Sequence, residues 1–136
     1  MFMKKVLSFI VLCLIAISVM AQTKVNDYVE VVYFHGKQRC ATCLAIEQHV
    51  KEVVERDFAI EKKSGKVHFK VVDISTPDGG RLAKDYRVAW ASLYISRWRN
   101  GKETRSDMTK FAFKNARMNT DVFKTGVKRK ISELLK

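Results

Sequence analysis

The apolar positions of the chain form short β-branched and aromatic runs that alternate with segments of helical spacing. Such runs, bounded by turn residues, predict strands, and apolar residues three or four positions apart predict amphipathic helices. The predicted strands cover residues 29–34, 67–74, 92–98 and a fourth segment from Lys102, and the predicted helices cover about 40–58, 81–86 and a last segment from Thr120.

Turn residues separate these segments. Asn100-Gly101 is a strong hairpin signal, so the third and fourth strands should pair antiparallel. Ser64-Gly65 interrupts the chain, residues 76–80 are interpreted as a turn, and residues 105–119 show no readable pattern. The resulting order predicts an α/β fold of the form βαβαββα, a mixed four-stranded sheet with helices on both faces.

The N-terminus has the pattern of a secretory signal peptide. A basic start with Lys4 and Lys5 precedes an apolar run over residues 6–20, and Val19-Met20-Ala21 supplies small residues for cleavage. We therefore expect a signal peptide at residues 1–21 and one domain at 22–136, exported to a periplasmic location. The alternative is an uncleaved membrane anchor, but a span needs about 20 apolar residues.

The charges are unevenly distributed. The chain has 26 Lys and Arg against 14 Asp and Glu, a formal net charge of +12. Basic and acidic side chains are equal in number in residues 22–80, whereas residues 81–136 carry fifteen basic and five acidic side chains. Such a surface attracts acidic proteins or anionic membrane surfaces, and export argues against nucleic acid. The alternative is a basic surface that serves solubility alone.

Cys40-Ala41-Thr42-Cys43 is the strongest chemical signal. Loss of residues 1–21 would leave these cysteines as the only pair, in a compartment where disulfides persist. Two intervening residues at a helix start let the sulfurs bond. Cys40 would lie where free backbone N–H groups and the helix dipole favour a thiolate. We predict a redox-active disulfide in which Cys40 attacks and Cys43 resolves, tuned by His35 and Arg39, with no other cofactor.

Two other interpretations of the pair remain open. A permanent structural disulfide is possible, although so short a loop adds little through chain entropy. A Cu(I) or zinc site would use Cys40, Cys43 and His35. His49 is a poorer ligand because six residues of helix turn it away from Cys43.

Taken together, the strand VVYFHG, the CATC helix start, the strand KVHFKVVDI and the later segment ending at RNGKE resemble the thioredoxin-like superfamily over residues 29–103. More narrowly, YFHGKQRCATCLAIE resembles a small exported family of nitrophenyl-compound nitroreductase subunits, the ArsF-like proteins. The resemblance implies thiol–disulfide exchange or electron transfer through Cys40 and Cys43. It also implies protein thiols or disulfides, or a partner reductase, as partners.

The chain departs from that family pattern in three ways, the first being a longer loop at residues 36–39 with no Trp before Cys40. The family places a cis-proline opposite the cysteines, but here the segment is Ala89 followed by Trp90, Ala91 and Ser92, and the one proline is Pro77. The first strand also lacks the family's buried acid. We expect Trp90, Ala91 and Ser92 to contact substrate, while the missing proline strengthens the metal alternative. A non-catalytic basic adaptor with a structural disulfide is the remaining hypothesis.

Overall fold

A computed structural model describes residues 26–136 together with Met3. Its elements are β1 (Tyr28–His35), α2 (Ala41–Asp57), α3 (Ala59–Ser64), β2 (Val67–Asp73), α4 (Pro77–Tyr86), β3 (Ser92–Arg99), β4 (Lys102–Asp107), α5 (Thr109–Asn115) and α6 (Thr120–Leu135). The four predicted strands and the helices α2 and α6 are confirmed.

The strands form one mixed sheet in the order β2-β1-β3-β4. β1 pairs in parallel with β2 and antiparallel with β3, and β3 pairs antiparallel with β4. Asn100 and Gly101 adopt φ values of 53° and 74° between β3 and β4. Positive φ at both central residues is what a tight type I′ hairpin requires, so the predicted hairpin is confirmed.

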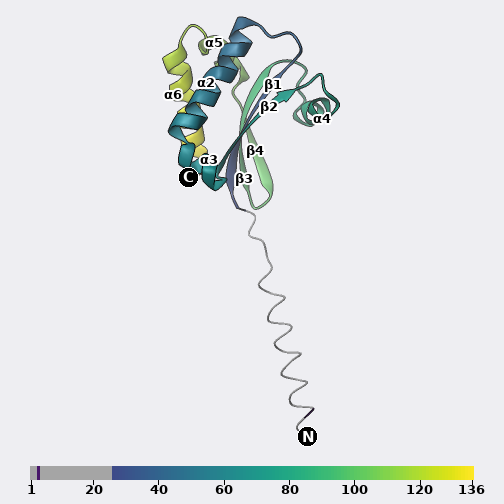
Figure 1. The fold of residues 1–136 in the computed structure, drawn as a ribbon, viewed down its shortest axis with the longest axis vertical. Helices are drawn as coiled ribbons and strands as arrows, with labels where there is room; N and C mark the ends of the chain where they lie inside the picture. The colour runs from purple at the N-terminus through teal and green to yellow at the C-terminus, as the bar shows by residue number, and fades with distance from the viewer. Residues whose placement is uncertain (1–2, 4–25) are drawn as a thin grey trace.

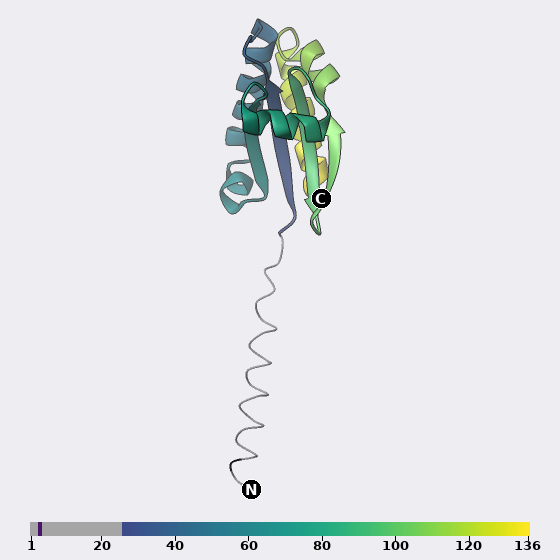
Figure 2. The same ribbon diagram turned by 90° about the vertical axis from the view of Figure 1, so that its right-hand side faces the viewer.

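Helices cover both faces of this sheet (Figures 1 and 2). On one face, Val31 and Tyr33 of β1 pack into a core shared with α2, α5 and α6. On the other face, Val32 and Phe34 pack against α4. β1 is therefore buried on both faces, as its apolar run predicts. The predicted α/β fold, βαβαββα with a mixed four-stranded sheet, is confirmed.

Residues 76–80 are not the turn that the sequence suggests, because α4 already begins at Pro77. The Thr76 hydroxyl accepts the Gly79 N–H at 3.0 Å, and proline at the first helical position loses no hydrogen bond. A Cβ on Gly79 would lie 1.8 Å from the Asp73 carbonyl oxygen. Glycine is therefore present for close packing against β2, within the helix.

The sequence pattern does not predict the two short helices α3 and α5. α3 follows α2 after the non-helical Phe58 and ends at Gly65, whose φ of 82° closes the turn into β2. α5 lies within residues 105–119 and packs against α6. Its Phe111 ring fills the space above Gly126, where a Cβ would approach within 2.2 Å. The packing of Phe111 on Gly126 depends on tertiary contact, which the spacing of apolar residues in the sequence does not reveal.

The expected signal peptide, residues 1–21, lies outside the described residues apart from Met3. Its boundary with the domain therefore stays a prediction. Among the described residues, no helix has the length and apolar character needed to cross a membrane.

Candidate functional site: the Cys40–Cys43 disulfide

Cys40 is the N-cap of α2, as the sequence predicts. Its backbone is extended (φ −75°, ψ 165°), and its sulfur accepts the Cys43 N–H at 3.1 Å. The Cys40 carbonyl accepts the Leu44 N–H at 3.0 Å and so starts the helical hydrogen bonds. The sulfur thus occupies the place of a capping oxygen, at the positive end of the helix dipole.

The two cysteines form a disulfide, and their Cα atoms lie 5.0 Å apart. They differ in accessibility: Cys40 is exposed, whereas only 7% of Cys43 is exposed. A visiting thiolate or disulfide can therefore reach the sulfur of Cys40 first. This asymmetry is what an attacking and a resolving cysteine require.

Tyr33 of β1 contacts the second cysteine. Its side chain is fully buried, and its hydroxyl donates to the Cys43 carbonyl at 3.0 Å. Burial raises the pKa of Tyr33, against the opposing effect of the nearby Arg39 cation, so the phenol stays protonated and donates. β1 carries no carboxylate at this position, and the tyrosine is its polar group there.

The Arg39 side chain is held by a carboxylate of α2. Its guanidinium pairs with Glu47 one and a half turns along α2, and its buried Nε has no hydrogen-bond partner. Arg39 therefore ties the loop before Cys40 to the helix. The positive charge beside the disulfide is partly neutralised by Glu47.

His35 ends β1, and its ring Nδ1 lies 2.9 Å from the Gly36 carbonyl oxygen, to which it donates. Within residues 26–136, no group of three or more His, Cys, Asp or Glu side chains could hold a metal ion. The structure thus does not bring His35 together with Cys40 and Cys43 as a ligand set.

A hollow of about 490 Å³ opens beside the disulfide. Cys43, Trp90 and Ala91 contribute to its walls, together with Gly36, Gln38, Ile74, Ala89 and Phe113. Trp90 is 71% exposed, so its indole is available to a partner. Ser92 is buried in β3 instead, and its hydroxyl donates to the Trp90 carbonyl at 3.0 Å, which shapes the turn that carries Trp90.

Five residues at this site are not singled out by the sequence: Tyr33, Gly36, Gln38, Ile74 and Phe113. Tyr33 was interpreted only as part of a strand, and Phe113 lies in the stretch without a readable pattern. Gln38 belongs to the loop before the cysteines. An aromatic residue in a predicted strand is an ordinary core residue, so no sequence signal distinguishes Tyr33. The approach of α5 to the disulfide is decided by packing.

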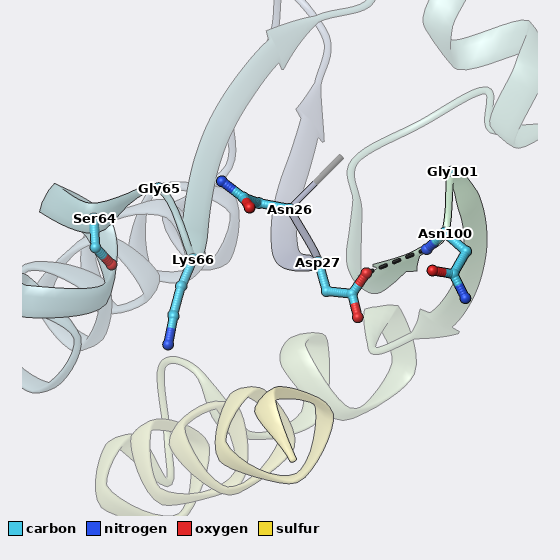
Figure 3. A pocket seen from close by; sticks show the side chains of 7 residues that line it. All are labelled: Asn26, Asp27, Ser64, Gly65, Lys66, Asn100 and Gly101. Carbon is cyan, nitrogen blue, oxygen red and sulfur yellow. Dashed lines mark hydrogen bonds between the residues drawn. The ribbon is translucent and has the colours of Figure 1, made fainter. Parts of the chain in front are cut away.

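A larger hollow, of about 830 Å³, lies where β1 begins, whereas the cysteines follow the other end of β1. Figure 3 shows the side chains that line this hollow. It is formed by the start of β1, the turn between α3 and β2, and the β3–β4 hairpin. There Asp27 accepts the Asn100 N–H at 3.2 Å and pairs with Arg99 at 3.4 Å. These contacts fasten the hairpin to β1, far from the cysteines.

No family model and no curated protein matches the chain. Solved structures that resemble it include a thioredoxin from Thermus thermophilus, with 18% identity, a TM-score of 0.47, and coverage of 75% of this chain and 72% of that one. Chlamydomonas reinhardtii thioredoxin f2 has 19% identity and a TM-score of 0.43, covering 73% and 77%.

A third structure, described as a malarial protein, has 17% identity and a TM-score of 0.40, and covers 63% of this chain and 92% of that one. At such low similarity, the strand order and pairing of the chain itself define its fold. That fold is a mixed four-stranded sheet in the order β2-β1-β3-β4 with helices on both faces, and it carries a Cys40–Cys43 disulfide at the N-terminal end of α2.

Proposed function

We propose that this protein is an exported thiol–disulfide oxidoreductase or electron-transfer protein that works through Cys40 and Cys43. The observation that carries the proposal is the asymmetric pair at the start of α2, with Cys40 exposed and Cys43 buried. A structural disulfide would need no such opening, nor an apolar hollow beside it.

The reductive half-reaction uses both cysteines. The Cys40 thiolate attacks one sulfur of a partner disulfide, a mixed disulfide forms, and the partner's other sulfur leaves as a thiolate that takes up a proton. The Cys43 thiolate then attacks the Cys40 sulfur, which releases the second partner thiol and forms the Cys40–Cys43 bond. Two electrons pass to the partner. The reverse sequence oxidises a dithiol.

The Cys43 N–H and the N-terminal end of α2 support the first step, because both favour negative charge on the Cys40 sulfur. Trp90 and Ala91 supply the surface against which a partner segment would lie. Ser92 acts through the Trp90 carbonyl, as a positioning residue.

We further propose that the protein works outside the cytoplasmic membrane, in the periplasm, beside a partner reductase or other protein thiols. The signal-peptide pattern of residues 1–21 and the resemblance to ArsF-like subunits support this. Fractionation of cells that produce the full chain, with N-terminal sequencing of the product, tests it. Retention of residues 1–21 in the cytoplasm would contradict the proposal.

Titration against glutathione buffers, with trapping of thiols by alkylation, tests the redox function. A reversible pair should give a potential between about −120 and −270 mV. Cys43→Ser should accumulate a mixed disulfide at Cys40, and Cys40→Ser should accumulate none. A potential below about −300 mV would identify a structural disulfide instead.

The same reduced sample distinguishes the metal alternative. Anaerobic incubation with Cu(I) or zinc followed by gel filtration should leave the protein without stoichiometric metal under the redox proposal. Tight binding that is lost in His35→Ala would favour a metal-binding module, since His35 is its third ligand.

A further inference from the structure

The surface around the disulfide has an apolar centre and a cationic rim. We define it as the redox surface: the centre is Leu44, Trp90 and Phe113, and the rim is Lys37, Arg87, Lys110, Lys114 and Arg117. We propose that the redox surface docks an acidic polypeptide that carries an apolar side chain beside its own cysteine or disulfide. This inference rests on the proposed redox function and names the class of its partner.

Three large apolar side chains of the centre are exposed. Trp90 is 71%, Leu44 51% and Phe113 39% exposed. Leu44 directly follows Cys43, and Trp90 and Phe113 line the hollow that Cys43 also lines. Exposed apolar residues that gather at one chemical group mark a contact site, whereas scattered ones do not. An aromatic anchor such as Trp90 is a frequent energetic centre of an interface.

The rim residues stand beside those that line the hollow. Lys37 lies between Gly36 and Gln38, Arg87 lies two residues before Ala89, and Lys114 directly follows Phe113. Lys110 lies one helical turn before Lys114, and Arg117 lies three residues after it. α5 and the first turn of α2 are at the same end of the molecule (Figure 1). The five cations thus lie on the segments that supply the lining of the hollow, or within one helical turn of a lining residue.

All five rim side chains are exposed, and none belongs to an ion pair within residues 26–136. Carboxylates also lie near this end. Glu47 pairs with Arg39, and Asp73 accepts hydrogen bonds from Ser75. Those hydrogen bonds, and then the nearby His35 and Lys37, lower the pKa of Asp73, so Lys37 is partly compensated. Residues 108–120, between Asp107 and Asp121, contain three cations and no acid. Lys110, Lys114 and Arg117 therefore supply most of the positive charge that the rim presents to an approaching molecule.

An acidic polypeptide fits this surface better than other anions do. Carboxylates would meet the rim, and a neighbouring apolar side chain would enter the hollow at Trp90 and Phe113. A cysteine between them would then reach Cys40. Complementary charge raises association rates by about 10 to 1,000-fold, and salt suppresses the effect. An anionic lipid surface would also meet the rim, but it would leave the hollow beside the disulfide without a specific occupant.

Synthetic peptides test the proposal directly. Each contains the same intramolecular disulfide next to a leucine, and the flanks carry glutamates, glutamines or lysines. The protein is reduced, freed of reductant and mixed with excess peptide. The second-order rate of Cys40–Cys43 disulfide formation is then measured in a single turnover. We expect the glutamate peptide to react at least about tenfold faster than the lysine peptide at low ionic strength. The ratio should approach one at about 1 M salt.

Charge reversal locates the effect. Lys114→Glu combined with Arg117→Glu should remove most of the preference for the glutamate peptide. Lys63→Glu combined with Lys66→Glu makes the same change in net charge at the opposite end of the molecule and should retain the preference. Equal losses in both double variants would show that net charge alone acts, and would overturn the docking surface.

A binding measurement separates this inference from the redox function. Cys40→Ser/Cys43→Ser protein should bind a fluorescent glutamate peptide more tightly than a lysine peptide, and Trp90→Ala in that background should weaken binding. Peptide binding without any exchange in the wild type would leave the docking surface intact and contradict the proposed function. Exchange without a preference for the glutamate peptide would support the proposed function and contradict the docking surface. Tight binding to phosphatidylglycerol vesicles with no peptide preference would overturn the acidic-polypeptide proposal in favour of a membrane surface.

Discussion

At the scale of single residues, two side chains outside the cysteine pair hold the segment that carries the disulfide. Tyr33 reaches from β1 to the Cys43 carbonyl, and Arg39 reaches from the loop to Glu47. Both contacts fix the first turn of α2 on the sheet. A rigid first turn keeps the N–H of Cys43 directed at the Cys40 sulfur.

We predict that Tyr33→Phe destabilises the protein by about 0.5 to 1.5 kcal/mol, because it removes a buried hydrogen bond to the Cys43 carbonyl, which then keeps only its helical donor. Urea unfolding of the oxidised protein measures the effect. Tyr94→Phe is the matched control, since the Tyr94 hydroxyl donates to Asp107 at 3.3 Å in an exposed contact. That variant should change the free energy of unfolding less. An equal loss in the two variants would mean that the Tyr33 bond has no special structural weight.

At the scale of elements, α2 and α6 are joined by a carboxylate as well as by the core. Glu52 of α2 accepts hydrogen bonds from Lys124 of α6 at 2.5 Å and, within α2, lies 3.2 Å from His49 and from Gln48. The hydrogen bond from Lys124, followed by those from His49 and Gln48, lowers the pKa of Glu52 to about 2. Its ordinary value is 4.5.

This depressed pKa predicts an acid-sensitive contribution to stability. Because the folded state holds the carboxylate ionised, the contribution is complete above the ordinary value of 4.5 and is lost as the pH falls toward about 2. Glu52→Gln should therefore flatten the decline in the free energy of unfolding over this range. Lys124→Met, which removes the strongest partner, should flatten it similarly. If the free energy of unfolding fell with decreasing pH as steeply in both variants as in the wild type, the contact would contribute nothing in solution.

The elements themselves differ in how far the sequence predicts them. Apolar runs predict the first three strands, the hairpin signal at Asn100-Gly101 predicts the fourth, and helical spacing predicts α2 and α6. The start of α4 is missed because Gly79 and Gly80 resemble turn residues, although Gly79 serves close packing. α3 and α5 are short, and their positions follow from packing against neighbouring elements.

At the scale of the whole molecule, the Cys40–Cys43 disulfide lies at one end of the sheet and outside the main core. That core is built from β1, β3, α2 and α6, with Val31, Ile46, Ile95, Phe123 and Ile131 among its fully buried members. The disulfide closes a loop with a sequence separation of only 3 residues. The fold therefore does not depend on this bond for its long-range contacts.

We accordingly predict that Cys40→Ser/Cys43→Ser protein remains folded and loses no more than about 2 kcal/mol of stability, the chain-entropy contribution of so short a loop. Circular dichroism and thermal unfolding measure this. The reduced wild type is the natural control and should behave alike. Global unfolding of either form would assign the disulfide a structural role and remove the main support for a redox cycle.

The sequence by itself determined the positions along the chain of the four strands and of α2 and α6, the hairpin at Asn100-Gly101 and the place of Cys40 at a helix start. These are local features, because propensity, periodicity and turn chemistry act over a few neighbouring residues. The tertiary structure alone decided that Tyr33 lies under the disulfide, that Arg39 turns to Glu47, and that Phe113 joins Trp90 beside Cys43. Such contacts join residues far apart in the chain through the packing of whole elements, which leaves no periodic trace in the sequence.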